Sequence, residues 1–182
     1  MLNLLQDDGY DAVHLRTVAK CAGVSLQTIY RYFPSRDELI IAAVSDWMQV
    51  NCYSTLDEPP AFASLYEAVM WLFQQLFEPW ERDPRMLEVY SRARLGPGGD
   101  RLAIQGYDAF APIFEDVVRD LDPDYADDVR VILAMVAAAG VEGLAGGRIT
   151  VPDIRRTLER ALLRLTSDNT ALLRGARSAG ST

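Results

Sequence analysis

Apolar residues recur at the helical period along nearly the whole chain, and this pattern constrains the fold more than any other feature of the sequence. No segment alternates apolar and polar residues over the length of a strand. No Asn-Gly or Asp-Gly pair joins two β-branched runs, as the turn of a hairpin would. We therefore predict an all-α protein.

Glycines, prolines and their acidic neighbours divide this pattern into separate helices. The predicted helices span residues 1–8, 15–22, 26–32, 36–53, 61–79, 84–95, 101–121, 124–145 and 152–166. Ser25 and Ser35 are predicted N-caps, and Glu38 follows Ser35 at the capping-box spacing. Residues 167–182 contain few apolar side chains, so we expect a flexible tail there.

Residue counts exclude several classes of site. One histidine and two cysteines among 182 residues rule out a His-based metal cluster and a four-cysteine zinc site, and argue against a Ser-His-Asp or Cys-His nucleophile. We expect no catalytic residue, metal or cofactor. No apolar run approaches the length of about 18 residues that a membrane helix needs, and the N-terminus lacks a secretory signal. We therefore expect a cytoplasmic protein with reduced thiols and no membrane partner.

The charge is distributed unevenly. The net charge is −8, which taken alone argues against a nucleic-acid partner. Residues 14–36 nevertheless carry four cations, Arg16, Lys20, Arg31 and Arg36, and no acid. Four cations in 23 residues is near the average density, so the missing acids are the signal. Local charge decides at a contact surface, because salt screens charges beyond about 8–10 Å.

Residues 15–30 have the pattern of a helix-turn-helix. Gly23 is predicted to take the turn with a positive φ. The residues expected to face inward are small or apolar: Val18, Ala19, Ala22, Val24 and Ile29. The residues left to point outward from the second helix are Leu26, Gln27, Thr28, Arg31 and Tyr32. A helix N-terminus with Ser, Thr and amide side chains suits phosphate oxygens and base edges.

A family resemblance covers about 30 residues of this region. The matching residues are Gly9-Tyr10-Asp11-Ala12-Val13, Val18-Ala19, Ala22-Gly23-Val24-Ser25, Thr28, Tyr30, Tyr32-Phe33-Pro34-Ser35-Arg36, Glu38 and Leu39. With these residues, segment 9–39 resembles the TetR family of bacterial regulators. The resemblance implies an N-terminal three-helix helix-turn-helix domain over 1–50, a helical domain for ligand binding and dimerisation over 51–166, and the tail 167–182.

The resemblance also implies that helix 26–32 enters the major groove of an operator. The DNA-contacting residues it implies are Leu15, Arg16, Ser25, Leu26, Gln27, Thr28, Tyr30, Arg31, Tyr32 and Arg36. Physically, Gln27 can read a base edge, and Thr28 and Arg36 can hold phosphates. Packing between helices is the stronger interpretation for Tyr30. His14 replaces the usual Thr or Ser cap of the family, so we expect a weaker cap at that helix. Cys21 is expected to be buried or half-buried and not a redox sensor.

Beyond residue 61 the chain is rich in bulky apolar side chains, which form a core or line a ligand cavity. We expect the ligand-contacting residues to be Trp71, Gln75, Met86, Tyr90, Arg94, Tyr107, Phe110, Phe114 and Met135. Residues 81–90 resemble regulators of sterol and lipid degradation in actinobacteria, which implies an acyl-CoA or steroid ligand. A drug-like or aromatic inducer is the alternative.

Small residues in 131–145 and an apolar stripe in 152–166 are typical of helices that approach closely. We expect a homodimer through Ala134, Ala138, Val141, Ala145, Ile154, Leu158, Ala161 and Leu162. The predicted function is a ligand-responsive homodimeric regulator, a repressor that a small apolar ligand releases from double-stranded operator DNA. The alternative is a helical binding module, or an enzyme, whose helix-turn-helix does not bind DNA.

Overall fold

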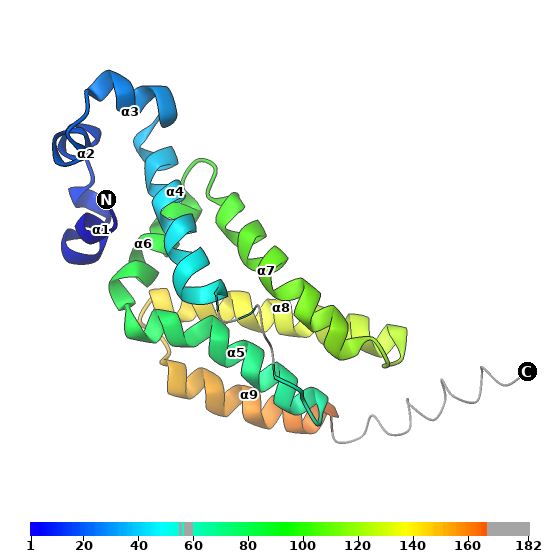
Figure 1. Ribbon diagram of the computed structural model, residues 1–182. Coiled ribbons are helices and arrows are strands. Elements are labelled where there is room, and N and C mark those ends of the chain that lie inside the picture. The colour runs from blue at the N-terminus through cyan, green and yellow to red at the C-terminus, as the bar shows by residue number, and fades with distance from the viewer. Residues whose placement is uncertain (55, 57–59, 167–182) are drawn as a thin grey trace, which may run out of the picture. The chain divides into compact units, whose positions relative to one another are not determined.

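The computed structural model describes residues 1–54, 56 and 60–166, and it contains helices and turns but no strand within those residues (Figure 1). The predicted all-α fold is confirmed. The flexible tail expected over 167–182 lies outside the described residues.

The helices follow closely the order that the sequence predicts. They are α1 (Leu2–Asp8), α2 (Leu15–Ala22), α3 (Leu26–Tyr32), α4 (Arg36–Met48), α5 (Leu65–Arg82), α6 (Pro84–Leu95), α7 (Asp100–Val118), α8 (Pro123–Ala145) and α9 (Val151–Thr166). The bounds of α2, α3 and α6 match the prediction. The predicted helix 36–53 is wrong in its last turn, because α4 ends at Met48 and a π-helix, η2 (Gln49–Tyr53), follows. A 3₁₀ turn, η1 (Tyr10–Ala12), joins α1 to α2.

The chain divides into two compact units. The first unit is drawn from Met1–Asp57 and Pro79–Ala109, and the second from Glu58–Glu78 and Phe110–Thr182. Compactness therefore groups α6 with the N-terminal helices, although more than 20 residues of the other unit lie between them in the sequence. The functional division at residue 50 stays a prediction.

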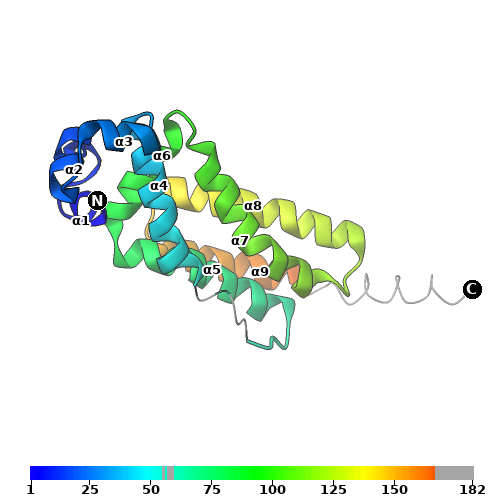
Figure 2. The ribbon, with the colours of Figure 1, turned by 45° about the horizontal axis from the view of Figure 1, so that its top comes forward.

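In the first unit, α1 and α4 pack against α6, and α2 packs against α3 (Figures 1 and 2). The core side chains with no exposed surface include Leu5, Val13, Ile40, Val44, Met86 and Val89. The Trp80 ring lies 5.0 Å from the ring of Trp47 and 5.0 Å from that of Tyr90, measured between centroids. These apolar contacts join α4, the end of α5 and α6 into one core.

In the second unit, α8 and α9 run antiparallel. The hydroxyl of Tyr125, near the start of α8, donates to the carbonyl oxygen of Leu165, near the end of α9, at 3.1 Å. A Cβ on Gly140 would lie 2.7 Å from the Phe77 ring, so a larger residue at this position would require that ring to shift.

The residues of the predicted dimer interface differ in their exposure within this single chain. Ile154, Leu158 and Leu162 are only 6%, 2% and 1% exposed within this single chain, and Val141 is 8% exposed. These four side chains pack inside the second unit, and the dimer interface itself stays a prediction. Ala145 and Ala161 are half-buried, whereas Ala134 and Ala138 are exposed.

Candidate nucleic-acid interface

The turn between α2 and α3 is built by local interactions. Gly23 has φ 66°, the left-handed conformation that the prediction assigned to it. The Ser25 Oγ accepts a hydrogen bond from the Thr28 amide at 3.0 Å and so caps α3. Val18, Ala19 and Ile29 are buried as predicted. Ala22 and Val24 are exposed, so the prediction that these two face inward is wrong.

One face of α3 is open to solvent and polar. Gln27, Tyr30, Arg31 and Tyr32 are exposed, and Leu26 and Thr28 are half-buried. Tyr30 is 51% exposed, so packing between helices does not account for this side chain. The Arg31 guanidinium donates to the Tyr32 hydroxyl at 3.1 Å and lies over the Tyr32 ring. The exposed face of α3 therefore presents hydrogen-bonding groups and aromatic rings next to each other.

The exposed surface continues onto α2. Arg16 and Lys20 are exposed, and Leu15 is half-buried. His14 occupies the N-cap of α2, and its side chain makes no cap hydrogen bond, in agreement with the weaker cap that the sequence predicts. We call Arg16, Lys20, Gln27, Tyr30, Arg31 and Tyr32 together the α2–α3 surface. It carries three cations and no acid, although the chain as a whole is acidic.

Arg36 is placed differently from the other predicted DNA contacts. Its guanidinium is half-buried, and its Nε donates to the Val13 carbonyl oxygen at 2.6 Å. Its Nη2 donates to the carbonyl oxygen of Tyr10. Two of the three nitrogens are therefore committed to the η1 turn. A phosphate contact by Arg36 stays a prediction, and any such contact has to come from the N–H groups that these two hydrogen bonds do not use.

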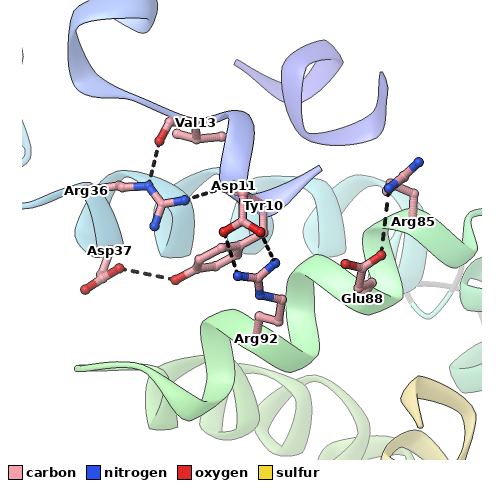
Figure 3. A network of polar contacts seen from close by, with 8 residues as sticks. All are labelled: Tyr10, Asp11, Val13, Arg36, Asp37, Arg85, Glu88 and Arg92. Carbon is pink, nitrogen blue, oxygen red and sulfur yellow. Dashed lines mark hydrogen bonds and ion pairs between the residues drawn. The ribbon is translucent and has the colours of Figure 1, made fainter. Parts of the chain in front are cut away.

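The same turn contains a polar cluster that the sequence analysis missed (Figure 3). The Tyr10 hydroxyl donates to Asp37 Oδ1 at 3.2 Å, and Arg92 of α6 donates two hydrogen bonds of 2.7 Å to the Asp11 carboxylate. The Arg36 guanidinium lies 4.6 Å from the Tyr10 ring centroid, and that of Arg92 lies 4.4 Å from it. The only sequence signal was the Gly9-Tyr10-Asp11 match, which gave these residues no role.

The first unit also holds a buried aromatic cluster, formed by Trp47, Trp80 and Tyr90. The Trp80 Nε1–H is buried, and no acceptor for it lies among the residues that the structure describes. Beside this cluster, burial raises the pKa of the Cys52 thiol to about 12. Burial also raises the pKa of Tyr90, while the nearby Arg94 opposes that shift.

The predicted ligand contacts are spread over both units. Met86, Tyr90, Arg94 and Tyr107 belong to the first, and Trp71, Gln75, Phe110, Phe114 and Met135 to the second. Met86, Tyr90 and Phe114 are buried, and Trp71, Gln75 and Phe110 are half-buried. Arg94, Tyr107 and Met135 are exposed. Met135 is 64% exposed and lies on the outer side of α8. The second unit does not enclose this side chain, so its burial gives no support to the prediction that it contacts a ligand.

The outer face of α8 is apolar. Val131 is 43% exposed, Ile132 is 38% exposed, and Ala134 and Ala138 are exposed beside Met135. Residues three and four apart on a helix are neighbours, so these side chains form one patch. We call this patch the α8 face.

In the described ranges 1–54, 56 and 60–166, none of the helices is long and apolar enough to cross a lipid bilayer. The His, Cys, Asp and Glu side chains of these ranges form no group of three or more that could hold a metal ion.

Comparisons with known proteins agree with this geometry. Residues 2–43 match the family model described as bacterial regulatory proteins, tetR family. Residues 63–165, more than half of the chain, match the model described as tetracyclin repressor-like, C-terminal domain.

The curated relatives include proteins named HTH-type transcriptional repressor KstR. The one from Rhodococcus jostii is 34% identical over 93 residues, which is 50% of this chain and 42% of that protein. The one from Mycobacterium tuberculosis is 32% identical over 85 residues, which is 47% of this chain and 39% of that protein. The chain thus aligns with less than half the length of these relatives.

A solved structure shares the fold. The crystal structure of a TetR transcriptional regulator from Rhodococcus sp. RHA1 superposes with a TM-score of 0.63, over 93% of this chain and 94% of that one. The sequence identity is 22%, so this similarity shows the fold alone.

Proposed function

Because the chain belongs to the tetR family of bacterial regulatory proteins, we propose that it is a DNA-binding transcriptional repressor that acts as a homodimer in the cytoplasm. A small apolar ligand releases it from its operator. The observation that carries this proposal is the exposed, acid-free α2–α3 surface on an otherwise acidic chain. The names of the relatives favour repression over activation.

The α2–α3 surface has groups for both kinds of DNA contact. The Gln27 amide can form two hydrogen bonds with the edge of an adenine, and Arg31 can do the same with a guanine. Arg16 and Lys20 of α2 supply the phosphate contacts, which position the protein and give most of the salt dependence. Ser25 and Thr28 act indirectly, because their mutual hydrogen bond at 2.8 Å holds the start of α3.

Dimerisation through the α8 face provides the second copy of α3 that a two-fold operator requires. Val131, Ile132 and Met135 are large apolar side chains in one exposed patch, and such patches mark protein–protein contacts. The exposed alanines beside them let two backbones approach closely.

For the ligand, the buried Trp47–Trp80–Tyr90 cluster suits an apolar molecule with at least one hydrogen-bond acceptor. The buried Trp80 Nε1–H, which lacks an acceptor among the described residues, supports the second requirement. The acyl chain of an acyl-CoA, with its thioester carbonyl, meets both requirements. A steroid or an aromatic inducer with a carbonyl or hydroxyl group meets them too. A coupling free energy of about 1–3 kcal/mol between the two sites is enough for release.

A helical binding module, or an enzyme with a non-binding helix-turn-helix, is the alternative. The net charge of −8 favours it. The matched family and the named relatives are regulators and not enzymes, which favours DNA binding.

The test starts from a duplex selected by the wild-type protein from a random DNA pool. A Gln27→Ala, Arg31→Ala variant should bind this duplex at least about thirtyfold more weakly, because each base contact is worth about 1–3 kcal/mol. The matched control is Gln74→Ala, Arg119→Ala, which removes an exposed amide from α5 and an exposed guanidinium from the turn after α7. The control should bind like the wild type.

Salt provides the second readout of this experiment. The affinity of the wild type should fall steeply and linearly, on logarithmic axes, as the salt concentration rises. If no duplex is enriched by selection, or if the Gln27, Arg31 variant keeps its affinity while its circular dichroism is unchanged, the repressor proposal is wrong.

A further inference from the structure

The Arg92 side chain joins two segments that lie far apart in the sequence. Arg92 belongs to α6, and it donates two hydrogen bonds to Asp11, which lies 81 positions earlier in η1. The Arg92 guanidinium also lies over the ring of Tyr10, the residue that begins η1. Both contacts are within the first unit, so one side chain of α6 holds two consecutive residues of the turn (Figure 3).

The other side of the turn is held by α4. The Tyr10 hydroxyl donates to Asp37, and Arg36 donates to the carbonyl oxygens of Tyr10 and Val13. η1 is therefore fixed by the first turn of α4 and by α6 together. Only two residues separate the end of η1 at Ala12 from the start of α2 at Leu15, so the position of η1 determines where α2 starts.

The electrostatics favour a complete ion pair at neutral pH. The hydrogen bonds from Arg92 hold the pKa of Asp11 below its usual value, and those to Asp11 raise the pKa of Arg92. The geometry is the bidentate one that a guanidinium and a carboxylate prefer. The side chains are 40% and 78% exposed, so water and salt weaken the pair.

We propose that Arg92 is a positioning residue for DNA binding: by holding Tyr10 and Asp11 against α6, it sets the place of the α2–α3 surface. This inference rests on the proposed function. It gives α6 a direct connection to the start of α2 that does not pass through α4. It also makes a residue about 60 positions beyond the recognition helix a determinant of operator affinity without a contact to DNA.

Replacement of Asp11 distinguishes a positioning effect on DNA binding from a purely electrostatic effect. Asp11→Asn deletes a negative charge, and a purely electrostatic effect would strengthen binding to DNA. Positioning predicts the opposite, because the bidentate pair with Arg92 is lost. The matched control is Asp8→Asn, which deletes the same charge from an exposed residue three positions earlier.

The experiment measures the affinity for the duplex selected by the wild type. Asp11→Asn removes the exposed ion pair, and Arg92→Gln removes both the ion pair and the cation–π contact with Tyr10; each variant should weaken binding about fivefold. Since both variants break the same pair, the double variant should bind no more than about twofold more weakly than either one. Arg92→Lys keeps the charge and should recover part of the loss. Asp8→Asn should bind as tightly as the wild type, or more tightly.

The dependence of affinity on salt tests whether Arg92 contacts a phosphate directly. The slope should be the same for Arg92→Gln and for the wild type; a slope that is smaller by about one would mean that Arg92 itself binds phosphate, and would overturn the inference. Affinity of Asp11→Asn equal to that of Asp8→Asn would overturn it too. These outcomes differ from failure of the proposed function, in which the wild type itself selects no duplex.

Discussion

The exposed faces of α3 and α8 show two different ways in which a helix can meet a partner. Each helix buries one side in its own unit, through Ile29 in α3 and Leu133 in α8, and exposes the other. The exposed side of α3 carries Gln27 and Arg31, whereas that of α8 carries Val131 and Met135. Water can form hydrogen bonds with the polar side chains of α3 but not with the apolar side chains of α8. The exposed side of α3 is therefore stable without a partner and suits reversible binding. Burial of the α8 face against a permanent partner, in contrast, lowers the free energy.

The two faces should also respond differently to solution conditions. Binding of DNA to α3 releases counterions and weakens as salt rises. Burial of the α8 face depends on apolar area, at about 25 cal/mol per Å², and is not weakened by moderate salt. The predictions below test this difference, and the largest expected effect comes first.

A charge placed in the α8 face should strongly weaken the proposed dimer. We expect Met135→Glu to raise the dissociation constant of the dimer at least about a hundredfold, because an unpaired charge in an apolar interface costs several kcal/mol. Light scattering coupled to size-exclusion chromatography measures the mass. Leu95→Glu, at a residue that is 91% exposed on α6, is the matched control and should remain dimeric. A Met135→Glu protein that is still dimeric at micromolar concentration would show that another surface forms the dimer.

The reactivity of the two cysteines tests whether the α2–α3 surface lies against DNA. Cys21 is exposed in α2, contrary to the sequence-based expectation, and Cys52 is 2% exposed with its pKa raised to about 12 by burial. Only the thiolate reacts, so at pH 8 a thiol reagent should modify Cys21 alone, and Cys52 only after unfolding.

A selected duplex at about ten times its dissociation constant should slow the modification of Cys21 about tenfold, if α2 lies against DNA. An unrelated duplex at high salt is the control. An unchanged rate in the presence of the selected duplex would contradict the placement of α2 at the DNA.

The smallest effect concerns the helix caps around the α2–α3 surface. His14 leaves the N-terminus of α2 without a side-chain cap, whereas Ser25 caps α3. His14→Ser should raise the free energy of unfolding by about 0.5–1 kcal/mol, and Ser25→Ala should lower it by about 1 kcal/mol. Urea denaturation followed by circular dichroism measures both. Equal stabilities for His14→Ser and the wild type would mean that water already satisfies the α2 amides.

Features that depend on near neighbours in the sequence could be predicted. Ser25 caps an amide three residues away, and Gly23 takes a conformation that its own missing side chain permits. The bounds of α2 and α3 follow from such short-range effects. The exposure of Ala22 and Val24 could not be predicted in this way, because it depends on what does or does not pack against that turn.

Features that join distant segments escaped prediction for a related reason. Periodicity shows that α9 has an apolar stripe at Ile154, Leu158 and Leu162, but it does not show whether the same chain or another covers the stripe. The pairing of Asp11 with Arg92 has no local signal, since either residue would be ordinary on any solvated helix. The π-helical turn of η2 keeps a nearly helical spacing of apolar residues and therefore looked like more of α4.

The split composition of the first unit has a consequence for synthesis on the ribosome. Residues up to 57 emerge first, yet α6, against which α1 and α4 pack, follows only after the segment from 58 to 78. Because translation adds about 5–20 residues per second, a few seconds pass between the synthesis of the N-terminal helices and that of α6. During that interval α4, whose Ile40 and Val44 are completely buried in the finished protein, lacks its contact with α6. A chaperone that binds short apolar segments would meet them at this stage.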